Sequence, residues 1–569
     1  MGSLQTNSGP LTPTLSKTTS DAEKPQDVDN VAEKENESGG APSPEPPTPS
    51  LEPSSPEPEK PHGLQMILIM SAVLMTQFLV SLDQTIVATA IPRITDEFHG
   101  LDKVSWYGSA YFMTFSGTLP CWGKALVYFR LKHIFLLALF VFELGSLICA
   151  VAPNANVLII GRAIAGLGCS GVGTGAFLFV ALAAAPRRRA KLLGLVISTY
   201  GIGAVCGPLI GGGFTANVSW RWCFYINLPI GGLAALFTVL SFNVHVDPLP
   251  ARFSEKVLQL DLGGAAVLMG GIIAFTLALQ YGGQTMAWDS SVVVGLLVGF
   301  VAIFAAFFAW EVWQRERAML VMRLCAQRAV WVGSAFQFFY GASYFVGLYY
   351  LPIYFQSVRD VSPSDSGVRN LPLVLAFGIS SITGGLALSR YGYAVPMMAG
   401  GSCLATVACG CFYTLGGSTT TGQWIGFQIL AGVAWGVCWQ CTMAVAQEGQ
   451  KPEHLPSITS IILLFQILGG AFGISIAQCA FNNTMIQNAL SNLPGIDASL
   501  LLGTGATEIR KVFSAQEIDG IVDAYIAGLR VVWGLMVGFA GSAFVVGLMS
   551  HWRRLYQDPD SKPATQHMA

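Results

Sequence analysis

The amino-acid sequence predicts an all-helical protein that crosses a lipid bilayer many times. Hydrophobic residues make up 52% of its 569 residues, charged residues only 11%, and the mean hydropathy is +0.54. Apolar runs of about 18 residues or more recur almost to the end of the chain, which is typical of membrane-spanning helices. A transmembrane β-barrel would instead show short segments in which polar and apolar residues alternate.

Residues 1–62 differ in composition from the rest of the chain. They contain 12 prolines, 4 Lys, no Arg and 11 acidic residues, a net charge of −7, whereas the remainder carries +5. Such a segment has too little apolar surface to form a core, so we expect a disordered tail. It lacks the apolar stretch of a signal peptide, and we place it in the cytosol. Residues 551–569 are expected to form a second cytosolic tail.

Fourteen apolar spans are expected between the two tails. They form an N-terminal six-helix half at 65–242, an extra helix pair at 260–312 and a C-terminal six-helix half at 329–550. Because the count is even, both termini are expected on one side of the membrane. The expected spans are 65–92, 104–127, 131–152, 157–185, 190–214, 220–242, 260–281, 290–312, 329–355, 367–389, 393–415, 423–446, 457–482 and 526–550.

The distribution of Lys and Arg among the connections indicates the orientation. If the N-terminus is cytosolic, the cytosolic connections carry 17 basic residues and the external connections carry 7. Basic residues concentrate on the cytosolic side of membrane proteins, so both termini are expected there. The long connection 483–525 then lies outside. The periodicity of its segment 506–525 predicts a helix on the membrane surface.

The expected fifth span carries a pattern of glycine and proline. Gly203, Gly207 and Gly211 are four residues apart, Pro208 follows Gly207, and Gly212 follows Gly211. Proline inside a helix removes a backbone hydrogen bond and tends to kink the helix. Glycines at this spacing leave a groove in which another helix packs closely. We expect this span to bend and to contact a neighbour; a packing helix without a role in transport is the alternative.

Asp83, Glu143 and Arg162 lie well inside expected spans, where an unpaired charge is costly and indicates function. At 1.5 Å per residue, Asp83 lies about 13 Å and Arg162 about 9 Å below the same face of the membrane. This similar depth allows a pair, which serves either proton coupling or structure alone. Glu143, near the middle of the third span, is either a second protonation site or a structural acid held by hydrogen bonds.

Aromatic and amide side chains are concentrated in the ninth span and at the end of the twelfth. Aromatic faces with a few amides suit an amphipathic organic ligand. Packing and lipid-interface belts are the alternative for each of these residues. The substrate-binding candidates are Gln337, Phe338, Tyr344, Trp435 and Trp439.

Several other classes of protein are not supported by the sequence. Residues 166–171 match GxGxxG, but they lie inside an expected membrane helix and do not follow a strand. There is no GxxxxGK[ST] phosphate loop, so ATP is not expected to drive the protein directly. We expect no enzymatic activity, no catalytic residues, no metal or cofactor, and no nucleic-acid partner. The CxxC spacing of Cys438 and Cys441 lies in an apolar helix, where small core residues are the preferred interpretation.

Three motifs resemble those of the fourteen-spanner drug:proton antiporters of the Major Facilitator Superfamily. Residues 82–92 read LDQTIVATAIP, which is similar to the LDxTIVxxALP signature of that branch. Residues 161–168 read GRAIAGLG, which resembles an RxxxGxG element, and residues 203–212 resemble the antiporter motif of the fifth helix. Residues 142–149 and 351–356 resemble the fungal toxin and secondary-metabolite efflux carriers in particular.

This resemblance implies a major facilitator fold of two six-helix halves plus two extra helices. It implies a proton-coupled efflux transporter for amphipathic organic compounds, either a fungal secondary metabolite or toxin or xenobiotics. The resemblance assigns Arg162 a role in proton relay, and we group Asp83, Arg162 and Glu143 as proton-coupling candidates. We expect a monomer in the plasma membrane, with the vacuolar membrane as the alternative. The rival functions are a transporter or exchanger of siderophores or basic amino acids, and a transport-dead receptor.

One element departs from the superfamily pattern. The loop after the second helix normally reads GxLxDRxGRK, but here Val127 occupies the acidic position and Arg130 replaces the following glycine. The charge network that closes the cytosolic face of such carriers is therefore expected to be weakened or rebuilt.

Overall fold

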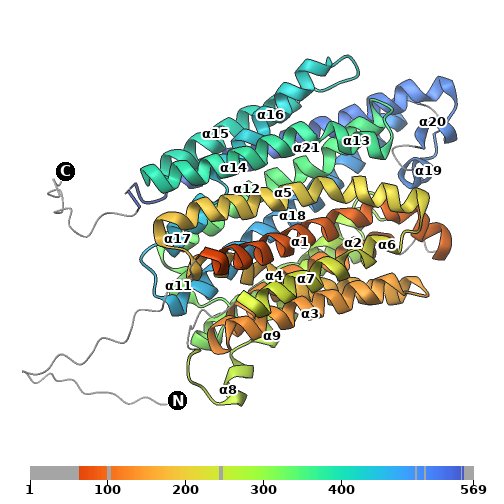
Figure 1. The fold of residues 1–569 in the computed structure, drawn as a ribbon. Helices are drawn as coiled ribbons and strands as arrows, with labels where there is room; N and C mark the ends of the chain where they lie inside the picture. Colours follow the sequence, from red (N-terminus) through yellow and green to blue (C-terminus); the bar gives the residue numbers. More distant parts are fainter. Residues whose placement is uncertain are drawn as a thin grey trace, which may run out of the picture. The chain divides into compact units, whose positions relative to one another are not determined.

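Figure 1 shows the computed structural model, which describes residues 63–98, 104–241, 248–493, 496–504, 508–552 and 554–555. The expected tail at 1–62, and nearly all of the expected tail at 551–569, lie outside these residues.

Helices make up almost all of the described chain, as the hydropathy pattern predicts. The N-terminal half contains α1 (Gly63–Phe98), α2 (Val104–Tyr128), α3 (Leu131–Ala150), α4 (Ala155–Ala183), α5 (Pro186–Asn217), α6 (Trp222–Tyr225) and α7 (Asn227–Ser241). The middle of the chain contains α8 (Phe253–Leu258), α9 (Leu262–Tyr281), α10 (Ser291–Gln314), η2 (Arg315–Arg317) and α11 (Met322–Cys325). The C-terminal half contains α12 (Arg328–Ser357), α13 (Pro363–Arg369), α14 (Leu371–Tyr391), α15 (Ala394–Phe412), α16 (Thr421–Cys438), α17 (Cys441–Gln447), η3 (Pro452–His454), α18 (Leu455–Asn492), α19 (Ala498–Gly503), α20 (Ile509–Val512) and α21 (Ala515–Leu548).

Local sequence signals account for several helix ends. The side chain of Asn154 accepts a hydrogen bond from the backbone N–H of Val157 at 3.0 Å and caps α4. Ser514 and Glu517 form a capping box at the start of α21. Gly392 ends α14 with φ of +74°, a conformation that glycine adopts without steric cost.

Twelve helices in the described part of the chain are long and apolar enough to cross a membrane. Two expected spans, α2 and α12, are not among them although they have 25 and 30 residues. Both are long enough to cross a bilayer, but α2 is rich in Gly, Ser and Thr and α12 in Tyr, which lower their hydropathy. The total of fourteen spans therefore stays a prediction.

Helix ends and breaks differ from the expectation at four places. The helix α18 continues to Asn492, and α21 already begins at Ala515. Residues 515–525, expected in a separate surface helix, therefore form the first turns of α21. The sixth span is divided into α6 and α7 next to Asn227, and the twelfth is divided into α16 and α17 at Trp439 and Gln440. Backbone groups freed by such breaks are tolerated at membrane depth where protein groups satisfy them.

The two halves meet along two pairs of helices. The helix α5 packs against α1 of its own half and against α14 of the other half, and α2 packs against α18 (Figure 1). The extra helices α9 and α10 pack on each other, and α9 also contacts α2 and α18. All described residues belong to one compact unit.

Candidate functional site

A buried ion pair joins the first and fourth helices. Nη1 of Arg162 donates to Oδ2 of Asp83 at 2.6 Å, and the two side chains are 1% and 0% exposed. The second carboxylate oxygen, Oδ1, accepts from Nδ2 of Asn227 at 3.0 Å, and the same amide contacts Oγ of Ser146 at 3.1 Å. The structure thus brings together the two residues that sequence depth allows to pair, and adds a neutral amide from the break before α7.

The guanidinium of Arg162 has partners besides the carboxylate. Its Nε donates to the carbonyl of Tyr107 at 3.0 Å, and its Cζ lies 4.2 Å from the ring centroid of Tyr111. Removing one partner from a buried ion pair typically costs about 3–5 kcal/mol, because the other charge is left unbalanced. The carbonyl of Tyr107 and the ring of Tyr111 are partners of Arg162 that do not depend on the charge of Asp83.

Glu143 lies between α3 and α7, about one helical turn from Ser146 and Asn227 of the Asp83 network. Both of its carboxylate oxygens are buried and have no hydrogen-bond partner among the described residues. They lie against Gly231, where a Cβ atom would collide with Oε1 of Glu143. The interpretation of Glu143 as a structural acid held by hydrogen bonds therefore has no support in the described residues, and a protonation site remains as the hypothesis.

The glycines of α5 face α1 beside the acid. A Cβ at Gly207 would collide with Oγ1 of Thr85, and one at Gly211 with Oγ1 of Thr89. A Cβ at Gly203 would lie 2.8 Å from the carbonyl oxygen of Phe78. This groove therefore lets α1 approach α5 on both sides of Asp83 in the sequence. Gly212 is half-buried, and its carbonyl accepts from Oγ1 of Thr215 at 3.1 Å.

Other faces of α5 meet the C-terminal half. A Cβ at Gly367 of α13 would lie 3.8 Å from Cβ of Pro208. Nearer the start of α5, the carbonyl of Gly194 accepts a hydrogen bond of 3.2 Å from Oγ of Ser381 in α14. The helix with the glycine and proline pattern is thus in contact with the helix of Asp83 and with the opposite half.

Four of the five substrate-binding candidates come together in the C-terminal half. The ring of Tyr344 lies 4.8 Å from that of Trp439, 5.5 Å from that of Trp435 and 4.9 Å from that of Phe377. Nε2 of Gln337 donates to the carbonyl of Trp439 at 3.1 Å, which is the backbone group freed by the break between α16 and α17. We call Gln337, Tyr344, Trp435 and Trp439, with Phe377, the aromatic cluster.

Phe338 does not belong to the aromatic cluster. Its ring lies 6.2 Å from that of Phe472 in α18, and Phe472 in turn contacts Phe275 of α9 and Phe300 of α10. The backbone of Phe338 also packs on Gly469. Because consecutive residues of a helix point in different directions, Phe338 is directed toward the extra helices while Gln337 is directed toward the cluster.

Sequence inspection missed a polar face on α1. Gln77, Ser81 and Gln84 are spaced so that they share one side of the helix, and each has a buried polar atom without a partner among the described residues. The hydroxyl of Tyr200 in α5 donates to Oε1 of Gln84 at 2.5 Å, and it also lies within electrostatic range of the hydroxyl of Tyr344. The spacing of these three polar residues in an apolar helix is visible in the sequence and could have predicted this polar face.

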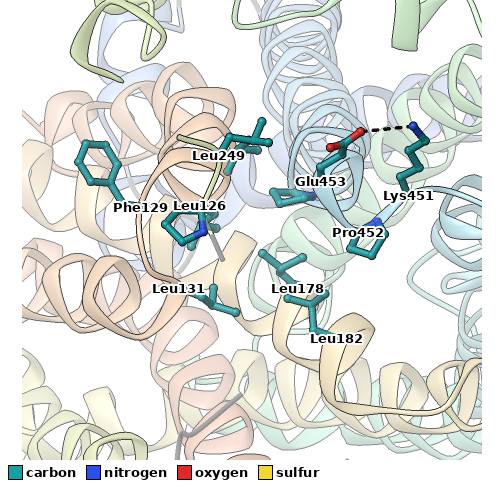
Figure 2. Close-up of a pocket in the computed structure, with 12 residues that line it drawn as sticks. Leu126, Phe129, Leu131, Leu178, Leu182, Leu249, Lys451, Pro452 and Glu453 are labelled. Atoms are coloured by element: carbon teal, nitrogen blue, oxygen red, sulfur yellow. Dashed lines mark ion pairs between the residues drawn. The ribbon is translucent and has the colours of Figure 1, made fainter. Parts of the chain in front are cut away.

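A separate pocket lies at the connection between α2 and α3, where residues of both halves form its wall. It has a volume of about 310 Å³ and is lined by leucines of α2, α3 and α4, by Leu249, and by residues of the segment that leads into α18 (Figure 2). Lys451 and Glu453 form an ion pair of 3.8 Å at its rim. Val127, which replaces the acid of the superfamily loop, also lines it. The residues of the aromatic cluster do not.

Comparison with known proteins adds independent information. A family model described as the Major Facilitator Superfamily matches residues 73–474. The MFS-type transporter grgE of Penicillium sp. is 50% identical over 549 residues, which cover 96% of each chain. The efflux pump notK of Aspergillus sp. is 39% identical over 87% of this chain and 88% of that protein. The dehydrocurvularin exporter of Aspergillus terreus is 38% identical over 90% of each chain.

Solved structures resemble the fold as well. The crystal structure of the human organic anion transporter MFSD10 matches with a TM-score of 0.52 at 14% identity, covering 85% of this chain and 100% of that chain. A bacterial homologue of the human lysosomal transporter Spinster, in an inward-facing and occupied conformation, also gives 0.52 at 14% identity, covering 86% and 97%. At this identity the likeness concerns the fold alone.

Proposed function

The chain belongs to the Major Facilitator Superfamily, and on that premise we propose that it exports an amphipathic organic compound in exchange for protons. The names of its relatives support export: one is an efflux pump and another is a dehydrocurvularin exporter. For this chain we propose a secondary metabolite or xenobiotic of comparable amphipathic character.

The observation that carries the proton part of the proposal is the buried pair of Asp83 and Arg162. A proton on Asp83 removes the charge that balances Arg162, so proton binding and ion pairing compete for the same carboxylate. A conformation that separates the pair favours protonation, and a conformation that restores it releases the proton. Linkage requires the converse as well: protonation favours the conformation in which the pair is open.

The packing of α5 offers a path from this carboxylate to the opposite half. Thr85 and Ile86, next to Asp83 in α1, lie against Gly207 of α5. The same α5 packs along α14, from which its Gly194 carbonyl accepts a hydrogen bond of Ser381, and it lies beside α13. A shift of α1 at the acid therefore changes the position of α5, and with it the interface on which the two halves rock.

The substrate in this proposal lies between the polar face of α1 and the aromatic cluster. The groups that would contact it are amides, hydroxyls and aromatic rings: Gln84 and Tyr200, which are hydrogen-bonded, and Tyr344 and Trp439, whose rings are in contact, with Tyr200 within electrostatic range of Tyr344. Such a surface binds an amphipathic compound through ring stacking and hydrogen bonds. We also propose a monomer in the plasma membrane with both termini in the cytosol, which the distribution of basic residues supports.

The test uses purified protein in proteoliposomes and a compound chosen because it raises the thermal unfolding temperature of the protein. With Asp83→Asn, export driven by an imposed pH gradient should fall by about tenfold or more, the effect of losing about 1.4 kcal/mol of coupling. Binding of the compound should persist. Glu97→Gln is the matched control, because Glu97 is an exposed acid at the end of the same helix, and it should transport normally.

Two results would contradict the proposal in different ways. If Asp83→Asn exports with the pH dependence of the wild type, Asp83 does not couple protons to transport. If the variant no longer folds while Glu97→Gln does, the pair is structural. Export that survives a protonophore would remove proton coupling altogether.

A further inference from the structure

A second buried acid pair lies where the extra helices begin and end. Asp261 caps the start of α9 with φ of +48°, and Glu311 lies in the last turns of α10. Their side chains are 4% and 0% exposed. Neither residue takes part in the transport proposal above, and no metal-binding group of three or more His, Cys, Asp or Glu exists in the described part of the chain.

Three of the four carboxylate oxygens in this pair are satisfied by N–H donors. Oδ1 of Asp261 accepts from the backbone of Gly264 at 3.0 Å and from Nε1 of Trp310 at 2.9 Å, and Oδ2 accepts from the backbone of Met319 at 3.2 Å. Oε2 of Glu311 accepts from the backbone N–H of Leu320 at 2.8 Å. Two of these donors, Met319 and Leu320, tie the acids to the segment that leads from α10 to α12.

The fourth oxygen, Oε1 of Glu311, has no N–H or O–H donor among the described residues. It is directed toward the other acid: a Cβ at Gly264 would lie 2.6 Å from Oδ2 of Asp261 and 2.9 Å from Oε1 of Glu311. The two carboxyl groups thus lie next to each other, on either side of the same point beside the backbone of Gly264. An ionised carboxylate can only accept, so this contact is a hydrogen bond only if one of the two groups carries a proton.

The surrounding charges favour a single proton on the pair. Lys124 of α2 is 3% exposed, interacts with both acids and with Glu316 of η2, and donates from Nζ to the carbonyl of Glu316 at 2.6 Å. The thiol of Cys121 on α2 lies within electrostatic range of both acids, and that of Cys325 on α11 within range of Glu311. One buried cation balances one carboxylate; two ionised carboxylates would leave a net buried charge, which is costly.

We propose that Asp261 and Glu311 share one proton and that, with Lys124, they form a second proton-exchanging site at the junction of α2 and the extra helices. The proposal also gives a substitute for the acid that the superfamily pattern has in the loop after α2. That loop lacks an acid at Val127, and the positive charge of Lys124 is met instead by acids of the extra helix pair. If α2 withdraws Lys124 as the halves rock, the pair loses its counter-charge and binds protons more tightly.

The direct test is infrared spectroscopy of the purified protein in lipid nanodiscs, which detects the C=O stretch of protonated carboxyl groups. Near neutral pH, Glu311→Gln should remove the intensity of one carboxyl group relative to the wild type, because Gln imitates the protonated acid. Glu255→Gln is the control, since Glu255 is paired with Arg317 at the protein surface, and it should leave the band unchanged. An unchanged band in a folded Glu311→Gln variant overturns the proposal.

A second variant tests the role of Lys124, and its result does not depend on whether Glu311→Gln folds. Lys124→Met removes the charge that favours ionisation of the pair. The protonated-carboxyl band should then persist to higher pH than in the wild type. A band that titrates as in the wild type overturns the link to Lys124. Because the band is read without transport, a failure of proton coupling at Asp83 leaves both measurements valid.

Discussion

At the scale of single residues, a neutral amide fixes the position of the buried acid Asp83 through hydrogen bonds. Asn227 is bound to both Asp83 and Ser146 and fixes the carboxylate that Arg162 neutralises. The sequence gives no sign of this, because an amide at the break between two short helices resembles an ordinary loop residue. The sequence allows the ion pair, because Asp83 and Arg162 lie at similar depth and a buried charge needs a partner, but only the fold places their two helices side by side.

Asn227→Ala is expected to destabilise the protein by about 1–3 kcal/mol, since it leaves the buried Oδ1 of Asp83 without its donor. It should also lower export driven by a pH gradient, because Asn227 fixes the carboxylate that Arg162 neutralises. Thermal unfolding and pH-dependent transport measure the two effects. Asn217→Ala is the control: that exposed amide bonds only to Gly213 of its own helix. Equal behaviour of the two variants would refute the assigned role.

A pH effect on stability is expected at the outer end of α1. Glu97 is partly exposed; burial acts to raise its pKa, but hydrogen bonds from Trp220 at 2.6 Å and Arg221 at 2.9 Å lower it below 4.5 overall. A lowered pKa in the folded state stabilises the protein above the unfolded pKa. This contribution is lost as the pH falls through the folded value. The unfolding temperature of the wild type should therefore drop more than that of Glu97→Gln on acidification below about pH 4.5; parallel curves would contradict this.

At the scale of elements, composition predicts where helices exist but not where they break. Hydropathy places α3, α4 and α10 within a few residues of their bounds. It cannot show that the sixth and twelfth spans are interrupted beside Asn227 and Trp439, since those breaks depend on tertiary partners for the freed backbone groups. For a related reason, the sequence could not show that Phe338 lies outside the aromatic cluster. One sequence run of aromatic residues covers several faces of a helix, and only the packing of α18 decides which face it presents.

The bend and groove of α5 give a prediction at this scale. Gly207→Val would collide with Thr85 and push α1 away, and Pro208→Ala would restore the backbone donor and straighten the helix. If this contact links the acid to the opposite half, both variants should lose coupled export or leak, while ligand binding persists. Gly213→Val is the matched control, because a Cβ at Gly213 meets nothing within 4 Å. Wild-type export by a well-folded Pro208→Ala variant would refute the link.

At the scale of the whole molecule, the two halves meet mainly along two pairs of helices. The interface runs along α5 and α14 and along α2 and α18. Such a layout is expected if the halves rock about these pairs while each half stays rigid. The sequence predicts the division into halves from the spacing of its spans, but not the role of the extra pair. Asp261 and Glu311 lie at span ends, where acids are ordinary, and only the fold brings them together with Lys124.

Rocking of the halves requires the pocket of Figure 2 to change shape, because its wall comes from both halves. Leu182 lies in α4 of the N-terminal half, and Glu453 lies in η3, directly before α18 of the C-terminal half. In a background without reactive cysteines, a bifunctional thiol reagent that joins Leu182→Cys to Glu453→Cys should stop export. A cleavable linker should restore export after reduction. Joining Phe129→Cys to Leu182→Cys, both within the N-terminal half and both lining the pocket, should leave export intact. Mass spectrometry confirms that each link has formed. Full export with the first pair joined would show that the two walls of the pocket do not separate during transport, and the rocking motion would then have to be located elsewhere.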